Sequence, residues 1–158
     1  STDSGRTWAA FSVGLANTDV AALAFDSLTG NRLYAATADG VFVLDRVNCA
    51  APTGLCLTGA RFRVEVAWSS TMTGQSGVGT AVPISEDTGS FWFFNAANLE
   101  LMIKVLDARA INRRFWVFYG ALSDVEYRIT VTDTVTGAVK IYVNPQGRLA
   151  SVADTSAF

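Results

Sequence analysis

Hydrophobic and polar residues alternate along most of the chain, and this pattern predicts β-strands. The clearest case is RFRVEVAW, in which hydrophobic residues occupy every second position from Phe62 to Trp68, with Arg63 and Glu65 between them. Because side chains alternate between the two faces of a strand, this spacing puts one hydrophobic face toward a core. No stretch shows the spacing of an amphipathic helix, although NAANLE suits a helical turn. We therefore expect an all-β protein.

Residues 59–158 contain seven or eight segments of this kind and predict one domain. The segments after RFRVEVAW are VGTAVPI, SFWFF, ELMIKVLD, RFWVFYG, VEYRITVTD and AVKIYVNP. SFWFF is apolar at nearly every position, as in a strand covered on both faces. VTG at 135–137 predicts the hairpin turn between the last two. Short strands at this spacing are typical of a β-sandwich, here expected to be immunoglobulin-like in outline.

Residues 1–47 predict a separate and smaller β segment. Four strands are predicted in this segment: residues 8–15, VAALAFDS, RLYAATAD and VFVLD. Asp39-Gly40 is a tight-turn signal between the last two. About four strands form a single sheet, which cannot bury both of its faces without a neighbour. We expect this segment to need a cover from elsewhere.

The chain opens with STDSGRTW, in which Ser1, Asp3, Gly5, Thr7 and Trp8 are spaced as S-x-D-x-G-x-T-W. This motif resembles, position for position, the Asp box of the bacterial neuraminidase repeat, which occurs in sialidases and other β-propellers. The resemblance covers residues 1–45 and implies a partial propeller-like blade. In that family the box shapes a turn on the outer rim, away from the active site, and its Trp packs between strands. It therefore implies architecture and no catalysis.

Residues 56–158 resemble an all-β domain that closes many secreted bacterial proteins, often after propeller-like or other β repeats. The resemblance rests on GARFRVEVAW, on the long run from SEDTG to DTVTG, and on the closing ASVADTSAF. It implies an extracellular location and a β architecture. It implies no activity.

Two cysteines, Cys49 and Cys56, flank the expected boundary between these regions. The chain has no histidine, so two thiols cannot complete the four ligands of a structural zinc site. We predict a local disulfide that clamps a linker at residues 48–58; two buried free thiols are the alternative. A disulfide indicates an oxidising compartment, outside the cytoplasm or in a periplasm. We predict the extracellular space or cell surface, ahead of the periplasm.

Composition excludes several classes of function. The 158 residues include 12 basic and 14 acidic ones, so nucleic acid is not an expected partner, and no apolar run is long enough to span a membrane. Without histidine, Ser-His-Asp and Cys-His catalysis are impossible. Acidic residues near strand ends are interpreted as turn formers rather than a catalytic pair: Glu86, Asp87, Asp107, Asp124 and Asp133. No motif indicates a metal, nucleotide or other cofactor, so we expect no enzyme.

The aromatic residues of SFWFF and RFWVFYG are denser than one core face requires. Trp92, Trp116 and Tyr119 are the candidates for an interface or a ligand site. Three interpretations remain open: core packing under a neighbouring segment, stacking on sugars, and a protein interface, where Trp and Tyr are enriched.

The strand edges favour assembly. Lys104 and Lys140 are the only lysines, so the edges lack the usual charged guards against pairing with another chain. We predict a non-enzymatic extracellular structural protein, a cell-surface or filament subunit whose copies join when residues 1–15 complete the β-sheet of a neighbour. The alternative is a glycan- or cell-wall-binding module at the end of a larger secreted propeller protein. A fragment of a glycoside hydrolase ranks third.

Overall fold

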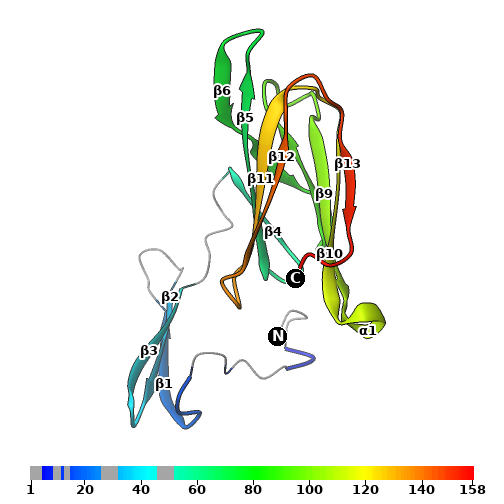
Figure 1. The fold of residues 1–158 in the computed structure, drawn as a ribbon. Helices are drawn as coiled ribbons and strands as arrows, with labels where there is room; N and C mark the ends of the chain where they lie inside the picture. Colours follow the sequence, from blue (N-terminus) through cyan, green and yellow to red (C-terminus); the bar gives the residue numbers. More distant parts are fainter. Residues whose placement is uncertain (1–4, 9–11, 13–14, 26–31, 46–51) are drawn as a thin grey trace. The chain divides into compact units, whose positions relative to one another are not determined.

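The computed structural model describes residues 5–8, 12, 15–25, 32–45 and 52–158 (Figure 1). The chain divides into two compact units, Ser1–Asn48 and Cys49–Phe158. Among the described residues, strands make up 56% and helix 3%, and every strand pair is antiparallel. The expectation of an all-β protein is confirmed.

The first unit contains one three-stranded sheet in the order β1-β2-β3. Its strands are β1 (Val20–Phe25), β2 (Arg32–Thr37) and β3 (Gly40–Asp45). The predicted turn between β2 and β3 is confirmed: Gly40 has a φ of 128°, and the Asp39 amide donates to Thr37 Oγ1 at 3.2 Å. A positive φ favours glycine at this position.

A strand over residues 8–15 is not supported by the described residues of that stretch. Trp8, Ser12 and Leu15 belong to no strand, and the Leu15 amide donates to the Ser12 carbonyl at 3.1 Å. The other residues of the stretch lie outside the described part of the chain. The three later strands, by contrast, were all correctly predicted.

The second unit consists of two facing sheets (Figure 1), one ordered β13-β10-β9-β8-β7 and the other β12-β11-β5-β4 with β6 also paired to β5. The strands are β4 (Gly54–Leu57), β5 (Phe62–Ser70), β6 (Gln75–Val78), β7 (Thr80–Pro83), β8 (Thr88–Trp92), β9 (Leu101–Ala108), β10 (Arg114–Ala121), β11 (Glu126–Asp133), β12 (Val139–Asn144) and β13 (Ser151–Asp154). A single helical turn, α1 (Arg109–Asn112), joins β9 to β10. The arrangement is sandwich-like, as predicted.

This unit has more strands than the seven or eight predicted, for identifiable reasons. β4 lies within the stretch expected to be a linker, and its two leucines, Leu55 and Leu57, are buried in the core. VGTAVPI is divided at Gly79 between β6 in one sheet and β7 in the other. A Cβ at Gly79 would lie 3.1 Å from the Phe93 ring, so glycine suits this crossing between sheets.

One hydrophobic core fills the space between the two sheets. The predicted alternation of β5 is confirmed, since Phe62, Val64 and Val66 are all fully buried. Burying such a side chain contributes about 1.5–3 kcal/mol. The core also takes inward residues from the other long strands: Leu101, Ile103, Val105, Phe115, Val117, Tyr127, Ile129 and Val131.

The prediction that SFWFF is covered on both faces is wrong. Phe91 and Phe93 are buried, whereas Trp92 is only partly buried and Phe94, just beyond β8, is 45% exposed. The NAANLE stretch forms turns rather than a helical turn, and α1 was not predicted. The VTG hairpin between β11 and β12 is confirmed, with Gly137 at a φ of 76°.

Candidate functional site

The described part of the Asp-box motif forms a tight turn. Gly5 has a φ of 88°, and the Trp8 indole Nε1 donates to the Gly5 carbonyl at 3.1 Å. The Trp8 side chain is 81% exposed, so it does not pack between strands as the resemblance implies. Ser1 and Asp3 lie outside the described residues, and Thr7 lies within the turn region. The assignment of an Asp box stays a prediction.

Of the two cysteines, only Cys56, in β4, lies among the described residues, where no cysteine is free. Cys49 lies outside them. The pairing of Cys49 with Cys56 therefore stays a prediction, as does the compartment inferred from it.

The three-stranded sheet of the first unit is apolar on both faces. The strand register places Leu23, Ala35 and Phe42 in one row across a face, with Phe25 in the next row of that face. The opposite face has Val43 in a row with Tyr34 and Ala24.

Little of this apolar surface is buried. Leu23 and Phe25 are each 64% exposed on one face, and Val41 and Val43 are 66% and 51% exposed on the other. Ala35 is the one buried residue among those described in this unit. The described residues therefore leave both faces of the sheet without a hydrophobic cover.

The second unit places the three candidate aromatic residues in two different environments. Tyr119 points into the core, where it is 6% exposed and its ring lies 5.4 Å from that of Tyr142. Its side chain is therefore part of the core. Trp116 and Trp92 are partly exposed on the outer face of their sheet. The structure thus separates Tyr119 from the other two.

A shallow, open hollow of about 410 Å³ lies on the outer face of the β13-β10-β9-β8-β7 sheet. The register brings Phe118 opposite Lys104, and Gly120 opposite Met102 on one side and Ser151 on the other. A Cβ at Gly120 would meet no atom within 4 Å, so this glycine leaves the floor of the hollow open. The Lys104 ammonium lies 5.2 Å from the centre of the Phe118 ring.

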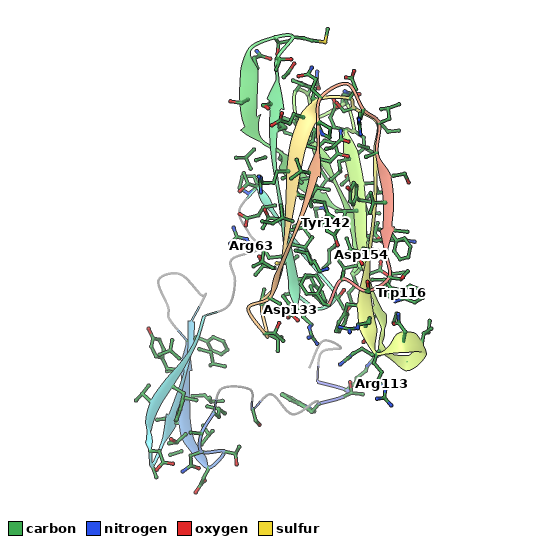
Figure 2. All side chains as sticks on the ribbon, viewed as in Figure 1. Arg63, Arg113, Trp116, Asp133, Tyr142 and Asp154 are labelled. Atoms are coloured by element: carbon green, nitrogen blue, oxygen red, sulfur yellow. The ribbon has the colours of Figure 1, made fainter. Side chains whose placement is uncertain are left out.

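The indole of Trp116 lies beside this hollow in a fixed orientation. Its ring centre is 6.0 Å from that of Phe118, and its Nε1 donates to Asn112 Oδ1 at 3.0 Å. The Asn112 amide in turn donates to the Thr155 carbonyl at 2.9 Å. Figure 2 shows Trp116 and Arg113 at the α1 end of the sheet. The unpredicted helical turn α1 therefore holds a candidate site residue.

Three of the acidic residues near strand ends, Asp133, Asp107 and Asp87, are held by separate partners. Arg61 donates to both carboxylate oxygens of Asp133, at 3.2 and 2.8 Å, and the buried Asp133 also accepts from the Val135 amide. Burial acts to raise the pKa of Asp133, but these hydrogen bonds and the charge of Arg61 outweigh it, so the pKa is lowered. The Arg61 guanidinium lies 4.2 Å from the centre of the Phe115 ring.

Hydrogen bonds also lower the pKa of two further carboxylates. Hydrogen bonds from Arg109 lower the pKa of Asp107 to about 2. Hydrogen bonds from the Ser85 and Thr88 hydroxyls lower the pKa of Asp87. The described residues contain no group of three or more His, Cys, Asp or Glu side chains placed to hold a metal ion.

A hydrogen bond across the sandwich edge was missed by the sequence analysis. The Tyr142 hydroxyl on β12 donates to Asp154 Oδ2 on β13 at 2.8 Å (Figure 2), and these are edge strands of different sheets. Burial is the main cause that raises the pKa of Tyr142, and the hydrogen bond to Asp154 adds to it. Lys140 Nζ lies 3.7 Å from the same oxygen. The alternation of β12 places Tyr142 on the inward face, and this position was the one sequence signal that its hydroxyl needs a hydrogen-bond partner.

Comparison with known protein families, curated proteins and solved structures finds no match to this chain. Among the described residues, no helix has the length and apolar character needed to cross a membrane.

Proposed function

We propose that this chain is a non-enzymatic extracellular structural protein whose copies assemble by covering and completing the three-stranded sheet of the first unit. The observation behind this proposal is that the sheet is apolar on both faces and that large side chains are exposed on each: Leu23 and Phe25 on one, Val41 and Val43 on the other. A sheet with one solvated face alternates between apolar and polar positions, whereas a sheet covered on both faces does not. The pattern of β1–β3 is therefore that of an inner layer.

The energetics favour a partner for this sheet. Three strands are the smallest number that forms a stable sheet, and only with a buried hydrophobic face. Repeat units of this size depend on their neighbours for burial. Covering an exposed Leu or Phe contributes about 1.5–3 kcal/mol, so burying Leu23 and Phe25 would contribute several kcal/mol in total.

The proposed arrangement follows from the resemblance of residues 1–45 to a propeller-like blade. Residues 1–15 of one copy act as the exchanged or docked strand, and β1–β3 of the next copy receive it. The sandwich, proposed to be immunoglobulin-like, is the body, and the proposed Cys49–Cys56 disulfide clamps the connection. A contact of this kind joins different surfaces, so it does not need to close and is able to build a filament.

A second surface supports assembly. The edge strand β12 has three apolar side chains on its outer face, Val139, Ile141 and Val143, which are 52%, 51% and 55% exposed. Lys140, on the other face of the strand, lies near Asp154 and so does not guard this outer face. Exposed apolar edge strands promote pairing with other chains.

Sedimentation velocity over a range of protein concentrations tests the proposal, with electron microscopy of any large species. We expect the chain to associate as its concentration rises and the double variant Leu23→Ser, Phe25→Ser to remain monomeric. Leu122→Ser with Leu149→Ser is the matched control, because these side chains are 75% and 73% exposed but lie in the second unit. A wild-type chain that stays monomeric, or a control that loses association equally, would contradict the proposal.

A further inference from the structure

The outer surface of β10 combines aromatic, cationic and open positions in one row. Alternate residues of this strand face outward, and from the α1 end they are Arg114, Trp116, Phe118 and Gly120. The inward residues between them, Phe115, Val117 and Tyr119, belong to the core. We infer that this row, together with the hollow at Gly120, binds an acidic polysaccharide. The inference is independent of the proposed assembly, which uses the first unit.

The lining of the hollow matches a sugar ring. Phe118 and Met102 supply apolar surface, while Lys104, Thr88 and Ser151 supply polar groups around it. A pyranose ring has a face of C–H groups that packs on an aromatic ring and a rim of hydroxyl groups that form hydrogen bonds. Ligand sites generally have this composition, with apolar surface for contact and a few polar groups for orientation.

The charges indicate that the sugar is anionic. Lys104, Arg113 and Arg114 take part in none of the ion pairs between described residues. Of the nearby acidic groups, Asp107 pairs with Arg109, whereas Asp87 accepts from two neutral hydroxyls and keeps a negative charge that interacts with Lys104. Three cations against the single charge of Asp87 leave an excess of positive charge along the row of aromatic rings, which favours a ligand with a carboxylate on its sugar units.

Two of the proposed contact residues are held in place before any ligand binds. The hydrogen bond to Asn112 fixes the Trp116 indole, and the contact with the Phe118 ring positions the Lys104 ammonium. Fixed side chains lose less conformational entropy on binding than mobile ones. The site is therefore suited to a rigid polymer that lies along the strand.

A protein strand is a poorer fit to this surface than a polysaccharide. β10 lies between β9 and β13 and pairs with both, so its main chain has no free edge for strand addition. A ligand must instead contact outward side chains, as a sugar does. The proposal is thus limited to oligosaccharides that contain uronic acids.

Isothermal titration calorimetry with oligogalacturonate, and with cello-oligosaccharide of the same length as the neutral control, tests this inference. We expect the chain to bind oligogalacturonate, more weakly at high salt, and to bind the neutral control at least about tenfold more weakly, since the charge contacts are screened or absent. Trp116→Ala and Lys104→Gln are each expected to weaken binding by about tenfold or more. Arg128→Gln, an exposed cation on β11 in the other sheet, is the matched control and leaves binding unchanged.

Gly120→Val separates a binding defect from a folding defect. Its new side chain enters the open hollow, where even the first carbon meets no atom within 4 Å, so the melting temperature stays at or above that of the wild type while binding is lost. Equal binding of the neutral oligosaccharide would overturn the assignment of an acidic ligand. An absence of oligogalacturonate binding, or binding that survives Gly120→Val, would overturn the site.

Discussion

The two units of this chain use similar hydrophobic strands with opposite results. In the sandwich, Val64 and Val66 of β5 are fully buried, and the alternate residues Arg63, Glu65 and Ala67 are polar or small. In the first unit, Leu23 and Phe25 of β1 are equally hydrophobic but are 64% exposed. The difference lies in the number of layers rather than in hydrophobicity. Two facing sheets cover each other, whereas a single sheet that is apolar on both faces requires an outside cover.

The largest expected effect is the difference in free energy of unfolding between two variants that each remove one phenylalanine, one from each unit. Phe62→Ala removes a fully buried ring that packs on Phe115 and Phe158, and we expect it to lower the free energy of unfolding by about 3–5 kcal/mol. Phe25→Ala, at a protein concentration where the chain is monomeric, is expected to change it by less than about 0.5 kcal/mol. Urea denaturation followed by tryptophan fluorescence measures both. Equal losses would contradict the contrast between the units.

The next effect concerns the buried carboxylate at one end of the sandwich. Asp133→Ala leaves Arg61 without its partner and leaves the Val135 amide unpaired, so we expect a loss of about 2–3 kcal/mol. Asp124→Ala is the matched control, because its exposed side chain makes none of the hydrogen bonds described for side chains, and it should cost less than about 0.5 kcal/mol. If urea denaturation gives the same free energy of unfolding for Asp133→Ala and Asp124→Ala, the Arg61–Asp133 pair does not stabilise the fold.

Two glycines on opposite faces of one sheet sharpen the comparison between filled and open surfaces. A Cβ at Gly89 would lie 2.5 Å from Leu55 Cδ2 and 3.0 Å from the Val82 carbonyl oxygen, so Gly89→Ala should cost about 1–3 kcal/mol. Gly120→Ala meets no atom within 4 Å and is expected to be neutral or slightly stabilising. Melting temperatures measured by circular dichroism test this. A harmless Gly89→Ala would show that the core there is less tightly packed than described.

The smallest expected effect is the dependence of sandwich stability on acid. The pKa values of Asp133 and Asp154 are lowered in the folded state, against about 3.9 in an unfolded chain. Their contribution is therefore complete above about pH 4 and is lost as the pH falls through the lowered folded values. We expect the melting temperature to fall below pH 4 and to fall less steeply in Asp133→Asn. An unchanged slope in that variant would show that Asp133 does not contribute.

Local patterns were sufficient to predict most strands and several turns. The alternation of β5 and the glycine turns at Gly40 and Gly137 depend on neighbouring residues only, and each was predicted correctly. β4 was missed because its four residues are too few to show a period, and it is a strand only through its pairing with β5. The division at Gly79 was missed because the pattern of hydrophobic residues is the same on both sides of a crossing between sheets.

The candidate site was only partly predictable. RFWVFYG shows that Trp116 and Tyr119 point to opposite faces, but both faces are hydrophobic, so the sequence does not reveal which one is the core. The Arg61–Asp133 and Tyr142–Asp154 contacts depend on the packing of strands that are distant in sequence or belong to different sheets. The hollow at Gly120 depends on the register of three strands.

Hydrogen exchange of the wild-type chain, followed by mass spectrometry at protein concentrations below and above the association midpoint, tests the central claim most directly. If a second copy covers the sheet of the first unit, amides of β1–β3 exchange more slowly at the higher concentration, while amides of β9–β11 in the sandwich exchange at the same rate at both. Exchange of β1–β3 that does not change with concentration would contradict the account.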